Sequence, residues 1–221
     1  MRSWDATFAG YFVDAIETLA ERPETSRREK RKLEIRGRIQ DSAYTLFRDQ
    51  GIQDTSIEQI CLAADVARRT FYGYYPNKDA LLRELSRERI SNTAEGMIEQ
   101  VMTEHSSTRG RVSAMIDYMA ANIRQYSDID RKLILITPVS ADDDNHLREL
   151  SASVQDHFRQ VFKAGIANGE LGQRFSPEIL SEMIMGTFNN MMVSWAVDAR
   201  FPIFEKLEEA RDLFDHILAQ T

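Results

Sequence analysis

Apolar residues recur every three to four positions along almost the whole chain, which is the spacing of one face of an α-helix. No segment alternates apolar and polar residues in the way that a half-buried β-strand does. The pattern therefore predicts an all-α protein. The expected helices cover residues 1–22, 27–50, 56–64, 66–75, 77–105, 111–126, 128–136, 145–168, 179–199 and 203–218.

Two short helices joined by a tight turn are predicted in residues 56–78, SIEQICLAADVARRTFYGYYPNK. Ser56 is a favourable N-cap, because its hydroxyl can accept a backbone N–H that has no partner inside the helix. The helical period breaks at Asp65, a residue type that tolerates left-handed backbone better than most. The second helix directs Phe71 inward and ends before Pro76, since proline disfavours helical backbone at the preceding residue.

The chain carries, in order, Gly51, Thr55-Ser56, Ile60-Cys61, Val66, Thr70-Phe71-Tyr72, Tyr75-Pro76 and Asn77-Lys78-Asp79-Ala80-Leu81-Leu82. At these positions it resembles the TetR family of bacterial transcriptional regulators, and the resemblance covers roughly residues 28–85. Three positions depart from the family pattern. Asp65 replaces the usual turn glycine, Ala67 replaces a Ser or Thr cap, and Arg69 stands where a small residue is common.

The resemblance implies an N-terminal three-helix DNA-binding domain with a helix-turn-helix, followed by a larger C-terminal helical domain for ligand binding and dimerisation. We expect an N-terminal extension over residues 1–26 and the DNA-binding domain over residues 27–75, with its motif at about 56–75. The helical effector-binding and dimerisation domain is expected over residues 76–221.

The N-terminal extension is predicted to form an amphipathic helix over residues 1–22. Its polar face is rich in acids, which argues against an anionic membrane surface. Two interpretations stay open: an extra helix docked on the body or on the other subunit, or a docking site for a partner protein. Its apolar stripe consists of Trp4, Phe8, Tyr11, Phe12, Ala15, Ile16 and Leu19.

The net charge of −7 is unevenly distributed along the chain. Residues 1–26 carry two basic and five acidic residues, and residues 91–221 carry twelve basic and twenty acidic ones. Residues 27–90 carry fourteen basic and ten acidic residues, a balance of +4. Of the three segments, only the one with the helix-turn-helix pattern has a net positive charge, as the neutralisation of DNA phosphates would require.

Side-chain chemistry divides the candidate DNA contacts into two kinds. Arg68 and Arg69 suit bidentate contacts to guanine edges, and Thr70 suits a thymine methyl or a phosphate. Ser56, Tyr72, Tyr74 and Lys78 suit phosphate contacts that fix the register. The family resemblance implies that the basic start of the preceding helix lies along the DNA backbone or reaches the minor groove; its residues are Arg27, Arg28, Lys30, Arg31 and Lys32.

The resemblance also implies a ligand pocket between helices of the larger domain, and nine methionines suit an adaptable apolar cavity. An acyl chain, an aromatic compound and a hydrophobic drug are all admissible, as is plain core packing. Candidate pocket residues are Met97, Met115, Met119, Phe158, Phe162, Phe188, Asn189, Met192 and Trp195. The last two helices match the family's dimerisation bundle, with candidate interface residues Ile184, Met191, Phe204, Leu207, Leu213 and Phe214.

Other classes of protein find little support. We expect no enzyme, because no nucleophile, base and orienting group form a recognisable set. We expect no cofactor and no metal, and the acidic run at Asp142 lacks the glycine and the terminal glutamate of a calcium loop. No apolar run reaches the length of a membrane span, the N-terminus does not read as a targeting peptide, and the single cysteine fits a reducing cytoplasm.

We therefore predict a cytoplasmic, homodimeric DNA-binding transcriptional regulator. It is expected to act as a repressor that an apolar small-molecule effector releases from a palindromic double-stranded DNA operator. The alternative is a DNA-binding regulator without a small ligand, controlled by a partner protein through the N-terminal helix.

Overall fold

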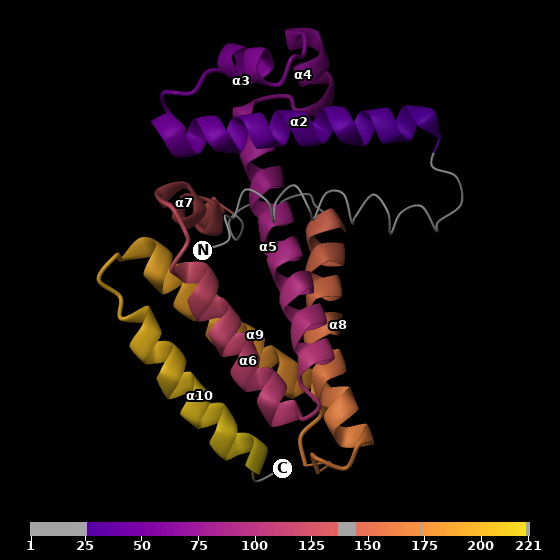
Figure 1. The fold of residues 1–221 in the computed structure, drawn as a ribbon, viewed down its shortest axis with the longest axis vertical. Coiled ribbons are helices and arrows are strands. Elements are labelled where there is room, and N and C mark those ends of the chain that lie inside the picture. The colour runs from indigo at the N-terminus through magenta and orange to yellow at the C-terminus, as the bar shows by residue number, and fades with distance from the viewer. Residues whose placement is uncertain (1–25, 137–144, 173, 220–221) are drawn as a thin grey trace.

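The computed structural model describes residues 26–136, 145–172 and 174–219, and all its regular elements are helices (Figure 1). The all-α prediction is confirmed. The predicted helix over residues 1–22 lies outside the described residues. The helices are α2 (Arg27–Gln50), α3 (Ile57–Ala63), α4 (Arg68–Tyr74), α5 (Lys78–Glu104), α6 (Thr108–Ile123), α7 (Asp128–Ile136), α8 (Asn145–Ala167), α9 (Pro177–Val197) and α10 (Ile203–Ala219).

Local capping chemistry explains where several of these helices begin and end. Ser26 and Ser56 each form a capping box, in which the hydroxyl accepts the N–H of the residue three positions on and that residue's side chain accepts the cap N–H. Asn77 and Ser176 cap α5 and α9 through one side-chain oxygen each. Gly51 ends α2 with a φ of 89°, a conformation that costs glycine little.

Two hydrophobic cores follow one another along α5. The first core joins α2, α3, α4 and the start of α5, and α7 adds Ile129 and Leu133 to it. The second core joins the far half of α5 to α6, α8, α9 and α10. The core of the DNA-binding end therefore draws on residues beyond 75, the position where we expected that domain to stop.

The arrangement of the helices places α3 and α4 at one extremity of the molecule (Figure 1). Helix α2 lies across the end of α5, with α3 and α4 on its outer side and α7 beneath it. Helices α6 and α8 pack on the other half of α5, and α10 lies on the outer side of α6 and α9 (Figure 1). Among the described residues, no helix is both long enough and apolar enough to span a membrane.

Candidate nucleic-acid interface

The turn between α3 and α4 is built around Asp65, whose φ is 51°. The N–H of Val66 bonds to the carbonyl oxygen of Cys61 at 3.0 Å and closes this turn. Ile60 on α3 and Phe71 on α4 are fully buried in the first core. These anchors fix the angle between the two helices and leave the opposite face of α4 to solvent.

The exposed face of α4 carries both candidate base-reading arginines, Arg68 and Arg69. Nη1 of Arg68 lies 2.9 Å from Oε1 of Glu58 on α3, an ion pair between two exposed side chains. A hydrogen bond with Tyr72, followed by the charge of Glu58, raises the pKa of Arg68, so its guanidinium stays protonated. No ion pair joins Arg69 to any other residue that the structure describes. Of the two arginines, Arg69 is therefore the more available for DNA.

The tyrosines of α4 differ in how far they reach solvent. Tyr72 is 44% exposed and Tyr74 is half-buried beside the first core. Tyr75 belongs to that core, and burial raises its pKa to about 12. Tyr72 is thus accessible to a phosphate, whereas Tyr75 serves packing.

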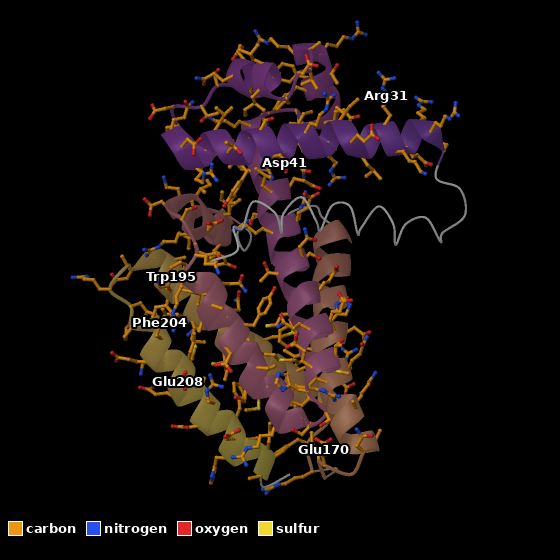
Figure 2. All side chains as sticks on the ribbon, in the orientation of Figure 1. Arg31, Asp41, Glu170, Trp195, Phe204 and Glu208 are labelled. Carbon is orange, nitrogen blue, oxygen red and sulfur yellow. The ribbon has the colours of Figure 1, made fainter. Side chains whose placement is uncertain are left out.

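The basic start of α2 projects beyond the rest of the DNA-binding end, as Arg31 in Figure 2 shows. Its candidate contacts Arg27, Arg28, Lys30, Arg31 and Lys32 are all exposed. Ser56 is exposed as well, and its hydroxyl accepts the N–H of Gln59 at 3.2 Å as the N-cap of α3. Thr70 is half-buried on α4. The fold thus gathers basic and hydroxyl side chains from α2, α3 and α4 at one end of the molecule.

Lys78 has a different position from the one we predicted. Its Nζ donates hydrogen bonds to the carbonyl oxygens of Ile52 at 2.6 Å and Thr55 at 2.9 Å. A lysine ammonium has three donors, and two of them here hold the α2–α3 loop against the start of α5. These carbonyls also explain why a cation occurs in the first turn of α5, where the helix dipole disfavours it. We propose that Lys78 positions the motif, in place of the predicted phosphate contact.

The substitution Lys78→Met is expected to lower the free energy of unfolding by about 2 kcal/mol, because two carbonyl oxygens lose a charged donor. Urea unfolding followed by circular dichroism measures this change. Lys163→Met, at an exposed position on α8, is the matched control and should stay within about 0.5 kcal/mol of wild type. If Lys78→Met left the stability unchanged and made DNA binding less dependent on salt, the result would instead support the predicted contact between Lys78 and a phosphate.

Comparison with known proteins agrees with this geometry. The model of a family described as bacterial regulatory proteins, tetR family, matches residues 39–85, which run from the middle of α2 into α5. Over its helix-turn-helix region the chain is therefore similar to the TetR family. The two curated relatives described next are both named as regulators, and neither is named as an enzyme.

Named relatives extend the comparison beyond the helix-turn-helix. The fatty acid metabolism regulator protein of Bacillus subtilis is 21% identical over 173 residues, covering 72% of this chain and 82% of that protein. A protein of Mycobacterium tuberculosis named as a transcriptional regulator of mycofactocin biosynthesis, MftR, is 25% identical and covers 86% of this chain and 94% of its own. The Thermus thermophilus repressor FadR, solved in complex with lauroyl-CoA, shares the fold, with a TM-score of 0.60, 24% identity and coverage of 79% and 90%.

Most of the candidate pocket residues gather in the second core. Met97, Met115, Phe158, Phe162 and Phe188 are buried there together. Met119, Met192 and Trp195 are partly buried and pack against the same core. Asn189 is exposed, because it faces away from the core on α9. Eight of the nine side chains thus share one apolar interior between α5, α6, α8 and α9.

The candidate dimer residues fall into two groups. Ile184, Leu207 and Phe214 are buried inside the subunit, so they have no surface to offer a partner and their assignment to the interface was wrong. For Ile184, the sequence pattern was misleading because α9 is apolar around much of its circumference, so the pattern does not show which side faces outward. Phe204 is 40% exposed and Leu213 is 51% exposed, and both remain candidates.

Met191, the sixth candidate, is only partly buried against the second core. The outer face of α9 instead carries Ile179 and Met183, both exposed, and Gly186, around which a side chain would meet open space. A shallow hollow of about 180 Å³ lies beside Met183, between α9 and α10. We therefore move the proposed interface to Ile179, Met183, Phe204 and Leu213.

Sequence reasoning missed the polar contacts that hold α2 on α5. Arg36 on α2 forms ion pairs with Glu84 and Glu88 on α5. Nε2 of Gln40 donates to Oε2 of Glu88 at 2.6 Å, although Gln40 is almost fully buried. The position of Gln40 inside the apolar stripe of α2 is the sequence feature that could have indicated these contacts.

Within the described ranges, no group of three or more His, Cys, Asp or Glu residues is placed to hold a metal, and Asp142 lies outside those ranges.

Proposed function

We propose that this protein is a homodimeric TetR-family repressor of a palindromic operator and that a fatty acyl-CoA releases it. The observation that carries the proposal is the contrast between the two faces of α4. Phe71 is buried in the first core, whereas Arg68, Arg69 and Tyr72 are exposed at the same end of the molecule as the basic start of α2 (Figure 1). A seven-residue helix presents too few side chains to select a site alone. Two copies related by a two-fold axis would read two half-sites spaced by helical turns of DNA.

A dimer is supported by the apolar side chains that the last two helices leave outside. Ile179, Met183, Phe204 and Leu213 are each at least 40% exposed on α9 and α10. Burying such side chains against a second copy removes apolar surface from water, worth about 25 cal/mol for each Å². Both helices also pack on the second core, so the state of that core would be felt at the interface.

An acyl effector is supported by the apolar interior and by what the named relatives bind or regulate. The second core includes flexible methionines and three phenylalanines whose rings meet edge to face, Phe158 with Phe188 and Phe188 with Phe214. Methionine-rich interiors adapt to ligands of irregular shape. The Thermus thermophilus protein of the same fold holds lauroyl-CoA, and the Bacillus subtilis relative is named for fatty acid metabolism.

Lauroyl-CoA is expected to dissociate the protein from its operator and to raise its melting temperature. The operator is obtained first by selection from a random 30-base-pair duplex library, and binding is followed by fluorescence anisotropy. At 100 times its Kd, a ligand that binds only the folded state stabilises it by about 2.7 kcal/mol. Octanoyl-CoA should act more weakly than lauroyl-CoA, since each buried methylene contributes about 0.8 kcal/mol.

Free coenzyme A is the matched control, because it lacks the acyl chain, and it should cause neither effect. If lauroyl- and stearoyl-CoA leave both the melting temperature and the operator complex unchanged, the acyl effector is excluded. If the selection yields no preferred palindrome at low salt, the operator model itself fails.

A further inference from the structure

A ladder of neighbouring aromatic rings and a guanidinium connects the two ends of the molecule. We define it as Trp195 on α9, Tyr126 after α6, Arg89 on α5 and Tyr44 on α2. The rings of Trp195 and Tyr126 have centroids 6.1 Å apart. The Cζ atom of Arg89 lies 5.4 Å from the ring centroid of Tyr126 and 5.1 Å from that of Tyr44. Arg89 is therefore held between one ring of the helical body and one ring of the DNA-binding end.

A buried carboxylate fixes the guanidinium in this position. Asp130 on α7 is only 2% exposed, and its Oδ1 lies 2.8 Å from Nε of Arg89. The same oxygen accepts the hydroxyl of Tyr44 at 2.9 Å, and Oδ2 accepts the N–H and the hydroxyl of Ser127, each at 2.7 Å. Burial raises the pKa of Tyr44 and of Tyr126, so both phenols stay neutral and Tyr44 keeps the proton that it donates.

Helix α7 ties the ladder to both cores. Its Ile129 and Leu133 are buried in the first core, and Ser86 on α5 donates to the carbonyl oxygen of Leu133 at 2.6 Å. On its other side, Nη2 of Arg131 donates to the carbonyl oxygen of Trp195 at 2.6 Å, and the guanidinium lies 4.7 Å from the Trp195 ring centroid. Trp195 sits at the end of α9 next to α7 (Figure 2).

Arg89 is thus in contact with both ends of the molecule at once. A guanidinium can stack on two rings and pair with a carboxylate at once because it is planar and keeps its charge, whereas an ammonium cannot reproduce that geometry. Moving Trp195 or Tyr126 shifts one wall of the Arg89 site, and moving α2 shifts the other. A change in the second core thus has a defined physical route to α2, on which the DNA-binding helices pack.

We propose that Arg89 is a positioning residue for DNA recognition, which sets the orientation of α2, α3 and α4 relative to the helical body and couples it to the state of Trp195. The proposal rests on the proposed function. It adds a named residue, a buried partner and a route, and Arg89 and Asp130 can both be altered without changing a DNA contact or a residue of the second core.

The test uses intrinsic fluorescence in the full chain with Trp4→Phe, which leaves Trp195 as the sole tryptophan. Binding of the selected operator is expected to change the emission of Trp195, because linkage between two sites is reciprocal. Arg89→Met and the milder Arg89→Lys should still bind DNA but lose at least half of this change. Both Arg89 variants should also bind operators with different half-site spacings about equally well. A residue that only stabilises the fold would not control this preference for spacing. Arg83→Lys, at an exposed position on the same helix, is the matched control and should behave as wild type.

A second measurement needs neither operator nor effector. Tyr44→Phe and Trp195→Phe, at opposite ends of the ladder, should change the unfolding equilibrium constant non-additively by at least about threefold. The non-additivity should vanish when Arg89 is lysine. Failure to select any operator would count against the proposed function only, and this cycle would still decide the ladder. Additive effects in the cycle, or a full emission change and unaltered spacing preference in folded Arg89→Lys, would overturn the proposal.

Discussion

Replacing Met183 and Leu213 together by glutamate is expected to leave a folded monomer that binds the selected operator at least about 100-fold more weakly. Both side chains are apolar and well exposed, at 40% and 51%, so the exchange costs the single subunit little. In a two-fold dimer the same positions recur on both copies, which brings four carboxylates into an apolar interface. Burying an unpaired charge is far more costly than losing apolar contact, so association should fail.

Sedimentation velocity reports the oligomeric state, circular dichroism reports folding, and anisotropy reports operator affinity. Ala152→Glu with Ala167→Glu adds the same charge at exposed positions of α8 and is the matched control. The control should remain a dimer with wild-type affinity. A double variant that sediments as a dimer and binds the operator normally would show that the exposed faces of α9 and α10 are not the interface.

Most helix boundaries were predicted to within two residues because they depend on neighbouring residues, although α6 begins and ends three residues earlier than expected. Ser56 caps its helix as expected, since an N-cap needs only an oxygen and an N–H three residues away, and Asn77 and Ser176 cap α5 and α9 by the same chemistry. The left-handed turn at Asp65 was anticipated from residue type alone and is present with a φ of 51°. Family resemblance supplied the overall architecture.

Contacts between distant residues were not predictable in the same way. The hydroxyl of Tyr44 bonds to Asp130, 86 positions along the chain, and periodicity does not specify such a partner. Ile184 was placed on the wrong side of α9 because residues on both sides of that helix are apolar. Lys78 was predicted to contact a phosphate. In the structure its ammonium donates to two carbonyl oxygens of residues more than twenty positions earlier, which the sequence pattern does not specify.

Arg69→Ala is expected to relax base preference at one operator position, with a loss of about 5- to 150-fold in discrimination there, the value of one bidentate contact to guanine. Arg69 is exposed on α4 and has no ion pair with another described residue, so it is available to DNA. Arg68 must first leave Glu58, which lies 2.9 Å away, so Arg68→Ala should have a smaller effect. Glu58→Gln should increase DNA affinity, because it frees Arg68 and removes a negative charge facing phosphates.

Arg69→Lys separates base reading from charge. A lysine keeps the positive charge but lacks the planar fork that contacts guanine at two atoms, so discrimination should fall almost as far as in Arg69→Ala. The slope of log affinity against log salt should stay at the wild-type value, since the number of neutralised phosphates is unchanged. Arg31→Ala at the basic start of α2 should do the opposite: it should lower affinity for all sequences alike and reduce the slope by about one. If Arg69→Lys kept full discrimination, Arg69 would be a phosphate contact, and base reading would have to come from Arg68 or from DNA shape.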